Sequence, residues 1–209
     1  MRRLSLFKFT SLLSLPLVAI NAGAQGGASA PPAAATRQIA LPDTLGASFS
    51  IADSTTGSGT SNDFDFLVGV WEFRFQQRNP NGTWNPLFVG HWFAERKKTP
   101  NGFVEDHFRA DNPTATYDVG TWTYRVFNPQ RKLWEMQGVG SESGQWQPGL
   151  CWSDGGNRYV VQHYGSTIVR IRYFAITDNA FLWRADMTTD GGKTWLLDRW
   201  TMSARRISK

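Results

Sequence analysis

The sequence predicts an all-β protein, a single antiparallel meander closed into a β-barrel of about ten strands. From Asp63 onward, segments of about seven to eleven residues rich in Val, Ile, Phe, Tyr, Trp and Thr alternate with short turn sequences. None of these segments has a helical period, so consecutive strands should pair as hairpins. A meander of this length leaves two exposed edges unless it closes on itself. A two-sheet sandwich is the alternative, but its longer crossover connections have no obvious place here.

Two segments precede the predicted barrel. Residues 1–24 combine a basic start, an apolar stretch from Leu12 to Ile20 and a small-residue end, Ala22-Gly23-Ala24. This pattern is typical of a cleavable secretory signal peptide. Residues 25–61 are dominated by Ala, Gly, Ser, Thr and Pro and are expected to form a flexible linker. The barrel domain is then expected over 62–205, in a protein that is periplasmic or secreted.

Turn chemistry separates the strands in order. Asn-Gly, Asn-Pro and Gly-Gly pairs occur between the apolar segments, for example at 79–82, 99–102 and 189–193. In the last of these, Asp190 can accept hydrogen bonds from nearby backbone amides. The strands are predicted near residues 68–78, 86–97, 102–110, 118–127, 132–140, 145–153, 157–164, 167–176, 181–188 and 194–204.

Composition excludes several partners. The net charge of +5 comes largely from the leader, because removing Arg2, Arg3 and Lys8 leaves 19 basic residues against 17 acidic ones. We therefore expect no nucleic-acid partner. No later segment is long and apolar enough for a transmembrane helix, so no integral membrane contact is expected. Cys151 is the single cysteine, which precludes an internal disulfide, and a homodimer remains open.

Three motifs resemble known β-barrels. Asp-Phe-Leu-Val-Gly-Val-Trp at 65–71 is similar to the Gly-x-Trp segment that opens lipocalin-like (calycin) barrels. Together with Phe127-Asn128-Pro129 followed by Trp134, and with the Asp-Gly-Gly-Lys-Thr-Trp run at 190–195, it also resembles a DUF1579-type bacterial family of unknown function. The resemblance implies a barrel whose first-strand Trp71 packs across a floor closed by a short helical turn. We expect Asp63 or Asp65 to cap that turn.

Alternation along the strands predicts which side chains face the interior. With Trp71 inward, Phe73 and Phe75 follow. Each turn is expected to hold an even number of residues, so the inward parity changes at every hairpin. The resulting inward sets are Phe88, Gly90, Trp92 and Ala94; Phe103, Glu105, His107 and Arg109; Trp122, Tyr124 and Val126; Leu133, Glu135 and Gln137; Trp146, Leu150 and Trp152; Tyr159, Val161 and His163; Ile168, Arg170, Arg172 and Phe174; Phe181, Trp183, Ala185 and Met187; Leu196, Asp198, Trp200 and Met202.

This assignment is sensitive to register, since one bulge reverses every later strand. In the eighth strand, Val169, Ile171 and Tyr173 form the more apolar face. This pattern indicates that Arg170 and Arg172 point to solvent. In the third strand, alternation places Glu105, His107 and Arg109 on one face. This face could point into the barrel or form a charged face in solvent, and both orientations stay open.

The predicted interior is aromatic with a few polar groups, a composition typical of small-molecule sites. The candidate catalytic residues are Glu105, His107, His163 and Tyr124, with Glu105 orienting His107 as a general base. The candidate ligand-binding residues are Arg109, Trp92, Trp122, Glu135, Tyr159, Arg172 and Trp183.

No metal or cofactor is predicted. The three histidines, His91, His107 and His163, lack metal-ligand spacing, and nothing selects haem although a lipocalin-like pocket could hold it. The leading hypothesis is an exported binder of a small hydrophobic or aromatic molecule. A cofactor-independent acid-base enzyme (lyase, isomerase or hydrolase) in the same cavity is the alternative, and a purely structural barrel is the third.

Overall fold

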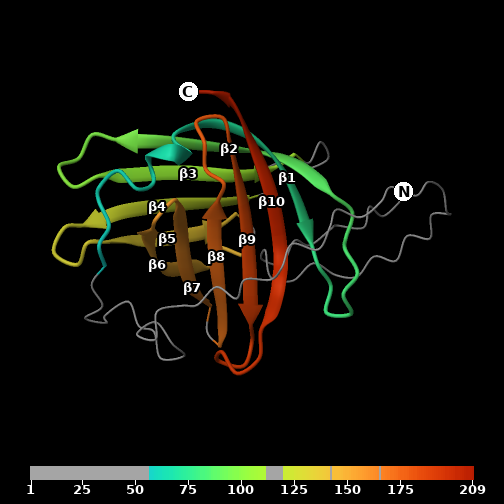
Figure 1. Cartoon of the computed structure of the whole chain (residues 1–209). Helices are drawn as coiled ribbons and strands as arrows, with labels where there is room; N and C mark the ends of the chain where they lie inside the picture. The colour runs from blue at the N-terminus through green and yellow to red at the C-terminus, as the bar shows by residue number, and fades with distance from the viewer. Residues whose placement is uncertain (1–56, 112–119, 142, 165) are drawn as a thin grey trace, which may run out of the picture.

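The barrel closes through pairing of its first and last strands. The structure is a computed structural model that describes residues 57–111, 120–141, 143–164 and 166–209. Within these residues, ten antiparallel strands follow one another and β1 pairs with β10 (Figure 1), which confirms the predicted fold class. The elements are the 3₁₀ turn η2 (Asp65–Leu67), β1 (Gly69–Gln77), β2 (Phe88–Lys97), β3 (Phe103–Ala110), β4 (Gly120–Asn128), β5 (Leu133–Gly140), β6 (Trp146–Asp154), β7 (Asn157–Tyr164), β8 (Thr167–Phe174), β9 (Ala180–Thr188) and β10 (Leu196–Ser208).

The predicted signal peptide and most of the predicted linker lie outside the described residues. The end of that linker contacts the barrel, because Gly57 N donates to Arg131 O at 2.7 Å and Gly59 N donates to Lys132 O at 3.0 Å. At the other terminus, β10 continues to Ser208. The described residues contain no helix with the length and apolar character needed to cross a membrane.

Two hairpins have odd loops, and they correct the predicted inward faces. Lys97 pairs with Phe103, which leaves five residues, 98–102, between β2 and β3. Gly102 ends this loop at a φ of 80°, a conformation that glycine adopts without strain. Phe174 pairs with Leu182, so the connection between β8 and β9 is odd as well. The first odd loop reverses the facing of β3 and the second restores it at β9.

The predicted inward sets were therefore right on β1, β2 and β9, right for Trp200 and Met202 on β10, and wrong from β3 to β8. The side chains that face the interior on these six strands include Val104, Asp106, Phe108, Thr121, Thr123, Arg125, Trp134, Met136, Gln147, Cys151, Val160, Gln162, Val169, Ile171 and Tyr173. The preference for an inward Val169, Ile171 and Tyr173, noted from the sequence, is confirmed.

Both faces of β5 to β8 carry buried apolar residues. The interior cluster centres on fully buried Trp71, Phe73 and Trp134. A second cluster lies on the outer face and contains Leu133, Leu150, Trp152, Val161 and Ile168. Because β6 is buried on both sides over Leu150 to Trp152, its hydrophobic pattern does not distinguish inside from outside.

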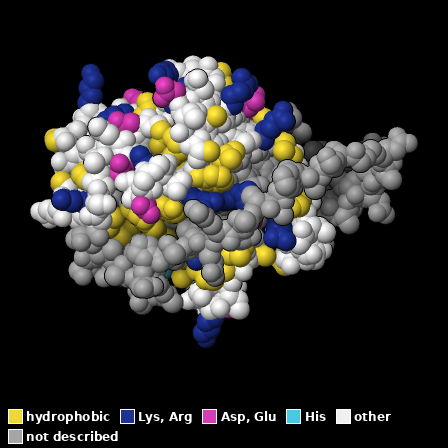
Figure 2. Space-filling view, viewed as in Figure 1, with side chains coloured by type: hydrophobic (Ala, Val, Ile, Leu, Met, Phe, Trp, Pro, Cys, Tyr) yellow, Lys and Arg dark blue, Asp and Glu magenta, His cyan; other side chains and the backbone are white. Residues whose placement is uncertain are grey.

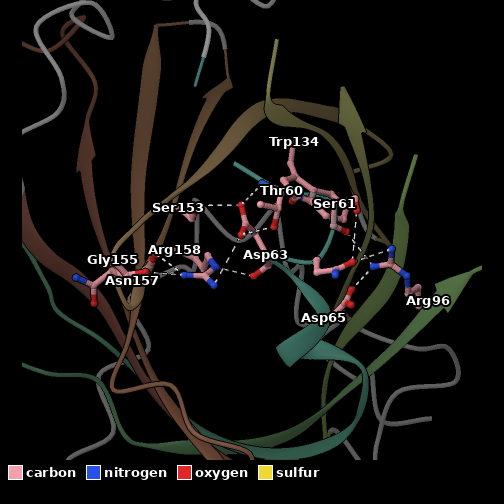
Figure 3. A network of polar contacts seen from close by, with 11 residues as sticks. Thr60, Ser61, Asp63, Asp65, Arg96, Trp134, Ser153, Gly155, Asn157 and Arg158 are labelled. Carbon is pink, nitrogen blue, oxygen red and sulfur yellow. Dashed lines mark hydrogen bonds and ion pairs between the residues drawn. The ribbon is translucent and has the colours of Figure 1, made fainter. Parts of the chain in front are cut away.

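The segment before β1 closes one end of the barrel (Figure 3). Asp63 is buried and accepts hydrogen bonds from Thr60 N at 2.9 Å, Thr60 Oγ1 at 3.0 Å and Ser153 Oγ at 2.8 Å. Arg158 Nε donates to Asp63 O at 2.6 Å, and Trp134 Nε1 donates to Thr60 O at 2.9 Å. These contacts tie the segment to β5, β6 and β7.

Arg96 binds the same closing segment from β2, through Asp65 and through Ser61 O at 3.0 Å. Neither acid caps η2, because Phe64 is its N-cap and no side-chain hydrogen bond is made there. The expected cap was therefore wrong. Asp63 instead accepts from the preceding turn and from the barrel wall, since a buried carboxylate needs several donors.

Candidate functional site

The barrel encloses a cavity of about 100 Å³. One water needs only about 10–15 Å³ by the same measure, so the space suits a small organic molecule. Aromatic side chains supply one part of the lining, namely Phe75, Trp92, Phe108, Tyr173, Trp183 and Trp200. Polar side chains supply the other part, namely Asp106, Thr121, Thr123, Arg125, Gln147 and Gln162, and Met136, Val169 and Ile171 complete the lining. An apolar cavity with a few convergent polar groups is the usual composition of a ligand site.

The two kinds of lining come from different strands. The aromatic rings lie on β8, β9, β10, β1, β2 and the end of β3, and the polar groups lie on β3, β4, β6 and β7. Since the strand order around the barrel is the sequence order, the cavity has an aromatic half and a polar half. A planar molecule with a polar substituent on one edge matches this division.

A buried ion pair occupies the polar half. Arg125 contacts the Asp106 carboxylate, and their side chains are 4% and 0% exposed. Trp92 Nε1 donates to Asp106 Oδ1 at 2.8 Å, and Arg125 Nη2 lies 3.5 Å from the Tyr173 hydroxyl. Because the two charges offset each other, this part of the cavity is polar without a net charge.

Some polar atoms around the cavity make no hydrogen bond to the described residues. They are Thr121 Oγ1 and Arg125 Nε, both buried. Unsatisfied buried groups of this kind cost about 1–3 kcal/mol each. Thr121 lines the cavity, so a ligand with a hydrogen-bonding substituent could satisfy its hydroxyl.

The aromatic half is built by packed rings. Phe75 and Trp183 have ring centroids 6.1 Å apart, and Trp92 meets Phe108 edge to face at 5.6 Å. Trp200 Nε1 donates to Gln77 Oε1 at 3.2 Å, which satisfies its polar atom. These neighbours fix the ring orientations, so the aromatic surface is preorganised.

Two further titratable groups lie near the ion pair. Burial raises the pKa of the Cys151 thiol to about 12, against a smaller opposing effect of the Arg125 charge. Burial likewise raises the pKa of the Tyr173 phenol. Both groups are therefore protonated and neutral near neutral pH, and neither is an activated nucleophile.

Among the residues proposed from the sequence, Trp92 and Trp183 line the cavity. The four candidate catalytic residues lie on the outer face, which decides the orientation left open for Glu105 and His107 and corrects the inward placement of Tyr124 and His163. His107 stacks on Trp122 with centroids 4.0 Å apart on the outer face. Glu105 pairs with Lys97 at 3.0 Å, and Tyr124 stacks on Phe103 at 6.2 Å.

His163, the fourth of these, lies on the outer side of β7, where partial burial lowers its pKa. The hypothesis of an acid-base group formed by Glu105, His107, His163 and Tyr124 thus has no support from their positions, because none of the four lines the cavity.

The other proposed ligand-binding residues also lie outside the cavity, because the odd loop before β3 turns them outward. Arg109 lies 5.1 Å from the Phe93 ring, and Trp122 is the stacking partner of His107. Glu135 pairs with Arg131 at 3.1 Å. Tyr159 stacks on Trp152 at 5.4 Å, and Arg172 lies 4.5 Å from the Phe174 ring.

The sequence reasoning missed the polar half of the cavity. Asp106, Thr121, Thr123 and Arg125 come from β3 and β4 with the opposite parity to the one expected. A signal was present, because Val104 and Phe108 flank Asp106 at alternate positions and so favour an inward Asp106.

No three His, Cys, Asp or Glu side chains gather as metal ligands within the described part of the chain. All three histidines lie on the outer face, His91 and His107 on the neighbouring strands β2 and β3 and His163 on β7. His91, for example, bonds to Asp111 at 2.9 Å.

Comparisons with known proteins support the fold. No family model and no curated protein matches the chain, so the DUF1579-type resemblance is not confirmed. Among solved structures, the S-type phycobiliprotein lyase CPES from Guillardia theta matches with a TM-score of 0.50 and 10% identity, over 70% of this chain and 90% of that one.

Two further structures match less closely. Rv2717c from M. tuberculosis has a TM-score of 0.48 and 11% identity, over 72% of this chain and 99% of its own. EF1p2_mFAP2b, solved bound to DFHBI, has a TM-score of 0.31 and 15% identity, over 71% and 99% respectively. The likeness to CPES supports the fold, a closed antiparallel β-barrel, and the interior of this barrel holds a cluster of buried aromatic side chains.

Proposed function

We propose that the barrel binds a small, planar, uncharged aromatic molecule that carries a hydrogen-bonding substituent. The observation that carries the proposal is the divided lining of the 100 Å³ cavity, with aromatic rings on one side and buried polar groups on the other. The ring of the ligand packs against Trp92, Phe108 and Trp183. Its substituent meets Thr121 and the edge of the Arg125 guanidinium.

The ligand is uncharged because the cavity offers no spare counter-charge. Arg125 and Asp106 are already in contact with each other and are almost fully buried. A charged ligand would lose its hydration and find only this compensated pair, and burying an unpaired charge is expensive. An amide, alcohol or ketone substituent exchanges hydrogen bonds without that cost.

Binding is favoured over catalysis by the chemistry of the cavity. Its ionisable groups are the compensated Arg125 and Asp106 pair and a Tyr173 phenol whose pKa burial raises. A general acid or base works best with a pKa near the operating pH, and Tyr173 shifts away from it. The cavity therefore favours a binder that leaves its ligand unchanged.

Calorimetric titration with benzamide and benzoate tests the proposal. The two probes have nearly the same shape, but only benzoate is charged. We expect saturable 1:1 binding of benzamide, with quenching of tryptophan fluorescence, and affinity for benzoate lower by at least about tenfold. Equal affinity for the two probes, or saturable binding of neither, would overturn the proposal.

A matched pair of variants locates the site. Thr121→Val keeps the shape of the side chain and removes the hydroxyl, so benzamide affinity should fall about five- to tenfold. Thr83→Val changes an exposed turn residue and should leave the affinity unchanged. Equal effects of both substitutions would place the binding elsewhere.

We also propose that the protein is exported, which rests on the signal-peptide pattern of residues 1–24. N-terminal sequencing of the protein purified from cell fractions tests it. Cleavage after Ala24 is expected, and an intact Met1 terminus in the accumulated protein would contradict it.

A further inference from the structure

A second cavity, of about 230 Å³, lies on the outer face of the barrel, over β9, β10 and β1. The sheet lies between it and the interior cavity, and Trp183 is part of the lining of both cavities. Its lining includes the side chains of Arg74, Gln76, Leu87, Leu182, Arg184 and Thr201. We call it the outer groove. Figure 2 shows basic and hydrophobic side chains gathered together on the face where β8 to β10 lie in front.

The strand register builds the outer groove as two adjacent rows. In one row, Arg74 pairs with Ser203 and Ser203 pairs with Leu182. In the other, Gln76 pairs with Thr201 and Thr201 pairs with Arg184. Since residues two apart along a strand point to the same face, the two arginines, the two hydroxyls and the amide all project to the same side of the sheet.

The outer groove carries excess positive charge. Arg74 is exposed and forms no ion pair with the described residues. Arg184 pairs with Asp198 at 3.1 Å, with both side chains about one third exposed. Arg172 borders the groove above Phe174 at 4.5 Å, and its buried Nε bonds to no described residue. Three guanidiniums thus face one carboxylate.

Apolar side chains flank these charges. Leu87 is 46% exposed and Leu182 is 39% exposed, and Phe174 lies beside them in the same groove. Exposed leucines are ordinary when they are isolated. Here they line one cavity with two guanidiniums, and a guanidinium fork matches the oxygens of a phosphate group.

We propose that the outer groove binds a phosphate monoester with an apolar substituent. The phosphate meets Arg74 and Arg184 and accepts hydrogen bonds from Ser203 and Thr201. The apolar substituent lies on Leu87 and Leu182. This proposal does not rest on the interior site, which takes an uncharged molecule on the other side of the sheet.

Titration with phenyl phosphate tests the site. We expect 1:1 binding that weakens with added salt and falls at least about fivefold in Arg74→Gln and in Arg184→Gln. Arg205→Gln is the matched control, because Arg205 is exposed on β10 outside the groove and contacts Glu72. Its affinity should stay within about twofold of the wild type. Absence of saturable binding, or an equal loss in the control, overturns the proposal.

Two further arms separate the parts of the ligand and its source. Leu182→Ser should lower the affinity for phenyl phosphate and leave the affinity for inorganic phosphate unchanged. Equal losses of affinity for the two probes would refute the apolar contact. Vesicles of phosphatidic acid in phosphatidylcholine, in which the anionic headgroup is itself a phosphate monoester, distinguish a lipid headgroup from a free ester. Binding lost in both arginine variants assigns the phosphate to a lipid, and phenyl phosphate binding without vesicle binding assigns it to a free ester.

Circular dichroism and thermal melting of every variant control for folding. The substituted side chains are on the outer face and partly exposed, so the melting temperatures should agree with that of the wild type within a few degrees. Benzamide binding to the interior should persist in all of them, which keeps the two proposals separately testable.

Discussion

The Arg206 guanidinium lies over the indole of Trp71, with its Cζ 4.0 Å from the ring centroid. It also donates Nη2 to Phe66 O at 2.8 Å and Nη1 to Val68 O. Trp71 Nε1 in turn donates to Leu67 O at 2.7 Å. One residue of β10 thus joins β1 to the segment that closes the barrel end, by a cation–π contact and two charge-assisted hydrogen bonds.

Arg206→Ala should lower the free energy of unfolding by about 2–3 kcal/mol, because it removes the cation–π contact and leaves two partly buried carbonyls without their donors. Arg206→Lys should recover only part of this, since an ammonium lacks the planar fork. Urea unfolding followed by fluorescence measures both changes. Arg205→Ala is the neighbouring control and should cost less than about 0.5 kcal/mol. If Arg206→Ala lost no more stability than Arg205→Ala, Arg206 would have no role in closing the barrel.

The buried pair of Arg125 and Asp106 should show strong coupling in a double-mutant cycle. Asp106→Asn leaves the Arg125 charge buried without its counter-ion, which costs about 3–5 kcal/mol, and Arg125→Met costs a similar amount. The double variant should lose less stability than the two single losses added together, because no unpaired charge remains in it. Urea unfolding gives the three values. Additive losses would show that the pair does not interact as the geometry indicates.

Glu95→Gln is the surface control for this cycle. Glu95 pairs with Lys97 at 2.7 Å, but its side chain is 72% exposed. Solvent screens such a pair, so the substitution should change stability by less than about 1 kcal/mol.

The strand pattern predicted the meander and its closure because alternation and turn chemistry are local properties. Trp71 and the turn around Asp190 also follow the sequence. Asp190 Oδ1 accepts from Thr194 N at 3.0 Å and Oδ2 accepts from Thr194 Oγ1 at 2.7 Å. Each of these features depends on residues a few positions apart.

The polar half of the cavity could not be predicted in the same way. The inward face of each strand is inferred from that of the strand before it, so one error is carried along the chain. The single extra residue in 98–102 reversed β3, and every hairpin up to β8 carried the reversal forward. Hydrophobicity did not correct it, since Leu150 on the outer face is as buried as Cys151 on the inner face. Arg125 was therefore assigned to the wrong side, and the polar run of Thr121, Thr123 and Arg125 at alternate positions resembles a solvated strand face.

Cys151 should be unreactive toward thiol reagents in the native protein. It is fully buried, and burial raises its pKa to about 12, so almost no thiolate is present at pH 8. Reaction with Ellman's reagent should be slow in buffer and complete within minutes in 6 M guanidinium chloride. The native rate should rise with urea in parallel with unfolding. Fast labelling without unfolding would show access to the thiol that the structure does not provide.

Asp190 makes stability depend on pH in the acid range. The hydrogen bonds that it accepts hold the pKa of the Asp190 carboxyl below its usual range, and the bond from the Thr194 hydroxyl contributes most. A group with a lowered native pKa contributes stability above its unfolded pKa of about 3.9, and this contribution disappears as pH falls through the native value. The wild type should therefore melt above Asp190→Asn at pH 5, and the difference should shrink toward pH 2.

Asp154→Asn is the control for this titration. Asp154 is exposed at the end of β6, and its side chain forms no hydrogen bond or ion pair with the described residues. Thermal melting of the three proteins at pH 5, 4, 3 and 2 gives the comparison. A difference between wild type and Asp190→Asn that stays constant over this range would mean that the hydrogen bonds to Asp190 do not favour its ionised form. The expected result is that the difference in melting temperature between wild type and Asp190→Asn narrows as pH falls, whereas the difference between wild type and Asp154→Asn does not. This would assign the pH dependence to the Asp190 turn.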